Sequence, residues 1–343
     1  RIASDGVATD LFGSARRLAE VRRKLKAILS LEGNETDIAW LRLPYPGPNG
    51  SGEGPSGRRS TQQQRSSPAG QPLEAPALHS APVQVGQSLE ALWAPPRGLI
   101  LAAPALAVAG DFSYTTGCLA LPPSTQTLSP AMDRSEQTML CLPTDVPEPN
   151  APQYQRHLDE MLIRLATVLL GDLVVVFPSH AALRTTAASI RRALEKQRVL
   201  LMAQGQDGSV RQLWHTFRSE SRVVLLGAGA FWDGGMPLER PPACVVITRT
   251  PFPALSDPLL AARADIWNDQ QNQFVVPHAA LKLRQALGGL AWSHWRRNAV
   301  VLFDHRLQTR SYGPTILGTL PRCTHYQEPV AQVIERIEEW IRG

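Results

Sequence analysis

The sequence lacks the patterns that mark several common functional classes. Its four cysteines are scattered and no two form a CxxC pair, so neither a disulfide scaffold nor a zinc or iron–sulfur site is indicated. We therefore expect a reduced, intracellular and cytoplasmic setting, without an iron–sulfur cluster in this chain. The eight histidines show no HxxxH or HExxH spacing, which argues against a metal site. No GxSxG string marks a hydrolase nucleophile, so an unrelated α/β hydrolase is a remote alternative.

Long apolar runs and a leader are also missing. The longest apolar run, residues 99–110, is about 12 residues long and contains Pro104, well short of the ~20 residues that a membrane helix needs. The chain opens on a polar, helix-like stretch rather than on a signal peptide. We expect no membrane partner.

The composition is that of a folded protein with enough chain for about two domains. It has 343 residues, of which 43% are hydrophobic and 19% are charged, so it can bury a core. The net charge of +5 and the pI of about 9.3 fit a polyanion such as nucleic acid, although many ordinary domains carry a similar charge. The 29 prolines exceed the usual share of ~5% and are unevenly placed.

The first 77 residues are predicted to hold only two short elements. Residues 14–30 have apolar side chains at helical spacing, which predicts an amphipathic helix with a solvated basic face rather than a dedicated DNA-binding helix. A strand is expected at 36–43. Residues 44–77 are dense in Pro, Gly, Ser and Gln. They predict a disordered surface insertion, because they cannot bury enough apolar surface to fold.

From residue 78 onward, the pattern predicts helices and strands in alternation, as in α/β proteins. Strands are expected at 98–103, 173–177, 199–203, 223–226, 244–248 and 299–303. Helices are expected at 85–93, 152–170, 180–196, 208–218, 257–268, 277–290 and 328–342. The strands after residue 135 are apolar throughout, which a parallel sheet covered on both faces requires. Residues 135–343 therefore predict one doubly wound, RecA-like α/β domain.

Ligands of open α/β sheets bind at the carboxyl ends of the strands, so the residues after each strand carry the functional signal. Five strings occur in order: PTDVPEPNAPQYQ at 143–155, FPSHAALR at 177–184, AFWDGGMP at 230–237, TPFPALSDPL at 250–259 and RSYGPTILGTLP at 310–321. Together, over residues 78–320, they resemble the second motor domain of the DinG/XPD-like superfamily 2 DNA helicases. The resemblance implies ATP-dependent DNA unwinding, with ATP and magnesium held between two RecA-like domains and single-stranded DNA as the partner.

Compared with that family, half of the motor is missing. The sequence contains neither a GxxxxGK[ST] loop nor a DEAH string, which the first motor domain uses to grip ATP. We expect residues 1–43 to be a partial remnant of that domain and residues 78–134 to be its end and the crossover. The second domain then occupies 135–343. The non-Met start at Arg1 fits a truncated chain.

The helicase strings that remain have lost chemical groups. The family's TSAT-like string aligns with residues 102–105, where no hydroxyl side chain remains, and its EGVD-like string ends at Met236 in place of the acid. The QGxGRxxR-like string aligns with residues 285–292, where Gly289 and Trp292 replace the two arginines. In relatives such arginines stabilise charge on the γ-phosphate, which is worth roughly 10³–10⁵ in rate. Arg296 and Arg297 are displaced from these positions, so we expect no ATP hydrolysis by this chain alone.

The residues that persist are given roles by the resemblance. The expected nucleotide contacts are Gly234, Gln285 and Gly288, and the expected nucleic-acid contacts are Ser179, His180, Arg249, Phe231 and Trp232. Some of these residues have plainer interpretations. Ser179 could cap a helix, the Phe231–Trp232 pair could pack in the core rather than stack on bases, and Arg249 could be a simple surface cation.

Two further features are expected to be structural. Asp304 and Arg306 are expected to form a local charge pair that fixes their loop. Trp292 and Trp295 are expected to fill the space that arginines occupy in relatives. Two functions therefore stay open: a helicase C-terminal motor region that is catalytically incompetent as this chain, or a non-catalytic pseudo-helicase module that binds single-stranded nucleic acid or a protein partner.

Overall fold

The computed structural model describes residues 19, 22, 37–42, 77–86, 88–89, 100–121, 137–233, 241–290 and 296–343. Most of the helix predicted at 14–30 lies outside these residues; Ala19 and Arg22 are described, and both are helical. The insertion predicted at 44–77 also lies outside them, except for Ala77, which begins a strand. Of the helix predicted at 85–93, residues 85, 86, 88 and 89 are described and helical.

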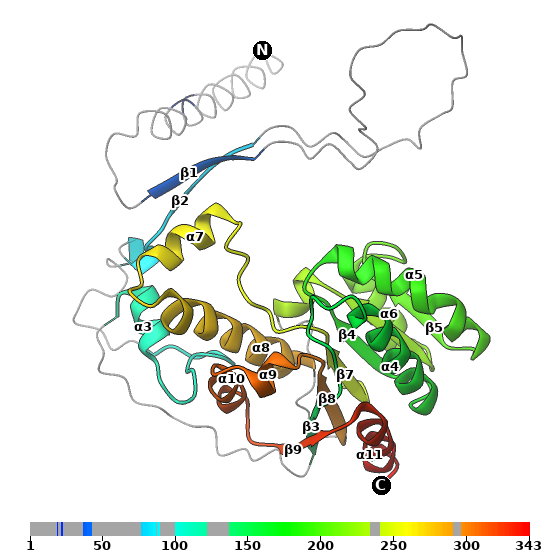
Figure 1. The fold of residues 1–343 in the computed structure, drawn as a ribbon. Coiled ribbons are helices and arrows are strands. Elements are labelled where there is room, and N and C mark those ends of the chain that lie inside the picture. Colours follow the sequence, from blue (N-terminus) through cyan, green and yellow to red (C-terminus); the bar gives the residue numbers. More distant parts are fainter. Residues whose placement is uncertain are drawn as a thin grey trace, which may run out of the picture.

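A seven-stranded parallel sheet forms the centre of the fold (Figure 1). The strands, in the spatial order β5-β6-β4-β7-β8-β3-β9, are β5 (Leu200–Ala203), β6 (Val223–Gly227), β4 (Leu173–Val176), β7 (Cys244–Ile247), β8 (Asn298–Leu302), β3 (Thr138–Pro143) and β9 (Thr324–Glu328). Every residue of the inner strands is buried, because helices cover both faces of the sheet.

Two sets of helices form the outer layers, each burying an apolar core against one face of the sheet. One face is covered by α4 (Tyr154–Val168), α5 (His180–Lys196) and α11 (Val330–Arg342). The other face is covered by α6 (Val210–Ser219), the 3₁₀ helix η1 (Gly229–Asp233), α8 (Val276–Leu290), α9 (Arg306–Thr309) and α10 (Gly313–Thr319). The predicted doubly wound, RecA-like α/β fold is therefore confirmed.

A third, smaller apolar cluster lies where α3 (Ser113–Leu119) meets α7 (Pro258–Asp265) and the π-helix η2 (Gln270–Val275). The Tyr114 ring lies 5.9 Å from the Trp267 ring and 6.1 Å from the Phe274 ring, measured between centroids. Next to α7, the antiparallel pair β1 (Asp37–Arg42) and β2 (Ala77–Pro82) forms a separate two-stranded sheet (Figure 1).

The structure differs from the predicted elements in several places. The strand predicted at 98–103 does not form at the described residues 100–103, which pair with no described strand and so lack the ladder hydrogen bonds that define one. Conversely, β2, β3 and β9 were not expected. The helix predicted at 257–268 ends at Asp265 and is followed by η2.

The segment that precedes the sheet is fastened to the helices of the large domain. The Arg284 guanidinium on α8 donates hydrogen bonds to the carbonyl oxygens of Pro104, at 2.9 Å, and Thr319, at 2.5 Å. The Ala109 amide donates to the Thr319 hydroxyl at 3.0 Å. These contacts cross the domain boundary predicted at 134/135, which itself stays a prediction.

Candidate nucleic-acid interface

The candidate residues gather at one edge of the sheet. Because all seven strands are parallel, the loops that follow β4, β6, β7 and β8 leave the sheet on the same side. Each of these loops carries at least one residue that the sequence singled out, and Gln285 approaches them from α8.

The loop after β4 presents a helix start at this edge. The Ser179 hydroxyl accepts a hydrogen bond from the Ala182 amide at 3.2 Å, so the predicted helix cap is confirmed. His180 follows on the exposed surface, and its Nε2 atom lies 3.6 Å from the point where a Cβ on Gly229 would stand. Gly229 has a φ of +53°, a backbone conformation that glycine adopts without strain. The edge therefore presents the N-terminus of a 17-residue helix beside an exposed imidazole, an arrangement that favours anions.

The loop after β6 contributes packing rather than a stacking platform. Phe231 is 0% exposed and Trp232 is 3% exposed. The Phe231 ring stacks on Trp214 at a centroid distance of 5.2 Å, and the Trp232 indole donates a hydrogen bond to the Phe177 carbonyl at 2.8 Å. The expectation that this pair contacts nucleic acid is therefore corrected: both rings are in the core, where no base can reach them.

The loop after β7 holds Arg249 in place. Its guanidinium lies 4.8 Å from the centroid of the Tyr154 ring and donates a hydrogen bond to the Pro149 carbonyl. The Tyr154 hydroxyl in turn donates to the carbonyls of Thr248 and Phe303, and burial raises the pKa of this tyrosine well above its ordinary value. Arg249 is thus half-buried and anchored, rather than a free surface cation.

Tyr154 is the functional-site residue that sequence reasoning missed. It lies within the string PNAPQYQ, and it joins the carboxyl ends of β7 and β8 through the two carbonyls that its hydroxyl contacts. A tyrosine that begins an amphipathic helix directly after a proline-rich loop was the available signal.

The loop after β8 contains a buried ion pair. Asp304 is 1% exposed and accepts hydrogen bonds from Arg306 Nε at 2.8 Å, from Arg306 Nη2 at 2.7 Å and from the Thr250 amide at 2.9 Å. Burial by itself would raise the pKa of Asp304, but the hydrogen bonds and charge of Arg306, together with the Thr250 amide, hold it below its ordinary value. The predicted local charge pair is confirmed, and it joins the β7 and β8 loops.

Gln285 reaches the edge from α8. Its side-chain amide donates a hydrogen bond to the Asp233 carbonyl at 3.2 Å, and Asp233 is the first residue of the DGGM string. Two of the aligned helicase strings are therefore neighbours in the fold. Gly288 and Gly289 lie one turn further along α8. The remaining candidates, Gly234, Met236, Trp292 and Trp295, lie outside the described residues.

The described residues do not reproduce the contact between arginine and triphosphate that the family motif implies. Gly289 stands at the first arginine position and offers no charged group. The basic residues of α8 are Lys282 and Arg284, and Arg284 is occupied by two backbone carbonyls away from the motif position. Arg296 pairs with Asp172 at 2.6 Å.

The described residues include no group of three His, Cys, Asp or Glu side chains arranged to hold a metal ion. Burial raises the pKa of the Cys141 thiol to about 12 and raises that of Cys244 as well. Within the same residues, no helix combines the length and apolar character needed to span a bilayer.

Comparison with known proteins identifies this domain. Residues 162–323 match the family described as the helicase C-terminal domain. This part of the chain is a DinG/XPD-like helicase C-terminal domain. A solved structure titled "XPD_Helicase" has the same fold, with a TM-score of 0.55 at 16% sequence identity over 73% of this chain and 46% of that one.

Curated relatives extend the similarity beyond the matched domain. The ATP-dependent DNA helicase YoaA of Haemophilus influenzae is 30% identical over 258 residues, which cover 73% of this chain and 40% of that protein. YoaA of Escherichia coli is 30% identical over 71% of this chain and 39% of its own length. The 3′-5′ exonuclease DinG of Bacillus subtilis is 26% identical over 71% of this chain and 28% of its own. The chain thus spans well under half of the length of each of these relatives.

Proposed function

We propose that this chain is the nucleic-acid-binding C-terminal motor region of a DinG/XPD-like DNA helicase, and that it does not hydrolyse ATP on its own. One observation carries the proposal. Gln285 is retained and contacts Asp233, so the site keeps its shape, while Gly289 stands where the motif requires a cation. A site that keeps this contact but has no cation at the motif position fits a domain that binds nucleic acid and lacks the group that stabilises phosphoryl transfer.

ATP with magnesium would contact this region only as one half of a site. The names of the YoaA relatives carry ATP dependence, but the similarity covers 40% and 39% of those proteins. In this proposal, Gly234, Gln285 and Gly288 line one side of the nucleotide, and a first motor domain that the described fold does not contain supplies the phosphate grip. Magnesium would be held through the phosphates and that first domain.

Single-stranded DNA is the proposed partner at the sheet edge. The α5 N-terminus, with Ser179 and His180 exposed, provides backbone amides and an imidazole for phosphate oxygens. Arg249 lies behind this surface, and its contacts to Tyr154 and Pro149 keep the neighbouring loop in shape.

Fluorescence anisotropy with a labelled oligothymidylate, measured across a salt series, tests this proposal. We expect affinity to fall steeply with salt, because phosphate contacts release counterions. His180→Ala should weaken binding severalfold. The matched control His157→Ala removes an equally exposed imidazole on α4 and should leave binding unchanged. Equal affinities for the two variants would show that the α5 N-terminus is not part of the interface.

The alternative is a pseudo-helicase module whose partner is another protein. The observation in its favour is an exposed apolar pair, Ile100 at 91% and Leu101 at 39% exposure, in the segment fastened to α8. Failure of the wild-type chain to bind any single strand at low salt would favour this alternative over the nucleic-acid proposal.

A further inference from the structure

The positive charge of the chain is concentrated in one stretch. Residues 180–222 contain eight Lys and Arg against three Asp and Glu, a net of +5, which equals the net charge of all 343 residues. The rest of the sequence is therefore neutral overall. This stretch comprises α5, the edge strand β5, α6 and the turns between them.

Within this stretch, α6 has an exposed basic side. Arg211, His215 and Arg218 are four and three residues apart, so they lie on the same side of the helix on consecutive turns. All three are exposed, whereas the opposite side of α6 buries Leu213, Trp214 and Phe217. The helix contains no acidic residue. Arg222, also exposed, follows shortly after the helix at the start of β6. We call Arg211, His215, Arg218 and Arg222 the α6 basic face.

These arginines are not neutralised by nearby carboxylates. In the described part of the chain, Arg211, Arg218 and Arg222 form no ion pair; Arg218 donates to the Trp214 carbonyl at 3.3 Å and Arg222 to the Gln197 carbonyl at 3.5 Å. Arg191 on α5 differs, because it pairs with Asp207 at 2.9 Å. A row of exposed, unpaired cations is the electrostatic footprint of a polyanion partner.

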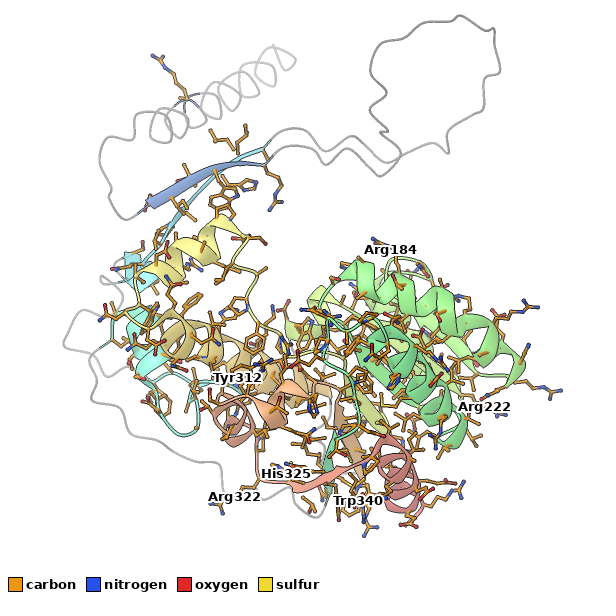
Figure 2. The ribbon with its side chains drawn as sticks, viewed as in Figure 1. Arg184, Arg222, Tyr312, Arg322, His325 and Trp340 are labelled. Carbon is orange, nitrogen blue, oxygen red and sulfur yellow. The ribbon has the colours of Figure 1, made fainter. Side chains whose placement is uncertain are left out.

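The α6 basic face begins beside the candidate interface. The Gln204 side chain, in the loop that leads from β5 to α6, accepts a hydrogen bond from the Ala228 amide at 2.8 Å. Ala228 precedes Gly229, the residue beside the His180 ring. At the other end of α6, the Arg222 carbonyl accepts from the Leu200 amide where β5 begins. The face therefore runs from the carboxyl edge of the sheet to its amino edge, and Figure 2 shows Arg222 on the side of the domain where α5 and β5 lie.

We propose that the α6 basic face binds the phosphate backbone of the nucleic-acid strand where that strand continues beyond the α5 N-terminus. This inference rests on the proposed function, because the two surfaces share one ligand. Arg211 and Arg218 are seven residues apart, a rise of about 10 Å along the helix. A strand that runs along the helix can therefore place different phosphates beside the two guanidinium groups. Exposed arginines facing a backbone contribute affinity that does not depend on base sequence.

The test compares two double variants in the oligothymidylate salt series. Arg211→Gln with Arg218→Gln removes two cations from the α6 basic face. Arg156→Gln with Arg342→Gln removes two exposed cations that already pair with Glu160 and Glu338, so the formal charge changes equally. At about −0.7 per contact on single strands, loss of two phosphate contacts should flatten the slope of log K against log salt by about 1.4. The control pair should keep the wild-type slope.

The outcomes separate this inference from the proposed function. If the Arg211 and Arg218 double variant keeps the wild-type salt slope while His180→Ala still lowers the affinity, the α6 basic face does not bind the strand. The proposed contact at the α5 N-terminus would then remain supported. Absence of binding by the wild-type chain would overturn both. Because both substituted side chains are exposed, circular dichroism should show unchanged folding, and a flattened slope in a folded protein supports the inference.

Discussion

Replacing Asp304 with asparagine should destabilise the domain far more than an ordinary surface change. The carboxylate is 1% exposed and accepts two hydrogen bonds from the Arg306 guanidinium, one from the Arg306 amide and one from the Thr250 amide. Hydrogen bonds to charged groups contribute about 1.5–3 kcal/mol, and breaking a buried ion pair costs about 3–5 kcal/mol. The Arg306 side chain is 24% exposed, so water recovers part of this loss. We expect the free energy of unfolding to fall by about 2–4 kcal/mol.

Urea unfolding followed by circular dichroism measures this change, and the chain offers a matched control. Glu148→Gln removes the carboxylate that pairs with Arg310, where the two side chains are 51% and 54% exposed. Such surface pairs contribute about 0–1 kcal/mol, so this variant should lie close to the wild type. Equal losses of stability in Asp304→Asn and Glu148→Gln would refute the claim that the buried pair holds the two loops.

The same reasoning fixes the pH dependence. The pKa of Asp304 is lowered in the folded state, so its contribution is fully present above the unfolded-state pKa of about 3.9. It is lost as the pH falls through the folded-state pKa. The difference in unfolding free energy between wild type and Asp304→Asn should therefore be constant near neutral pH and shrink below about pH 4. A difference that grows toward acid would contradict the assignment.

Two further predictions concern the core. Phe231→Ala should lower the free energy of unfolding in urea by about 3–5 kcal/mol, because it empties the space beside Trp214. If the variant keeps its stability but loses affinity for single strands, Phe231 stacks on bases rather than packing in the core. The Cys141 and Cys244 thiols should react with a thiol reagent at pH 8 only after unfolding, because both are buried and the pKa of Cys141 is raised to about 12. Rapid labelling of all four cysteines in the folded chain would show that these strands open readily.

Four of the five inner strands of the central sheet were predictable because they are continuous apolar runs, whereas the fifth, β3, was not expected. The strings LVVVF, VVLLG, CVVIT and AVVLF mark β4, β6, β7 and β8 without any knowledge of their neighbours. By contrast, β9 reads THYQE and has an alternating burial pattern at the edge of the sheet. Only its pairing with β3 makes it a strand, and such pairing is invisible in a local pattern.

In the candidate site, too, contacts between residues close in the sequence were predictable and contacts between distant residues were not. The Ser179 cap and the Asp304–Arg306 pair depend on neighbours within three residues, and the sequence predicted both. The Tyr154 contacts reach across 94 and 149 residues, so local reasoning had no access to them. For Phe231, chemistry alone allowed either a base or a core neighbour, and the choice depended on the distant Trp214 helix.

Phosphate release by the purified chain, with and without single-stranded DNA, tests the central claim most directly. A domain that keeps Gln285 but has Gly289 at the arginine position should bind the strand and show no DNA-stimulated hydrolysis of ATP above the buffer rate. DNA-stimulated release that is abolished by Gln285→Ala would contradict the account, because it would show that this chain completes a catalytic site by itself.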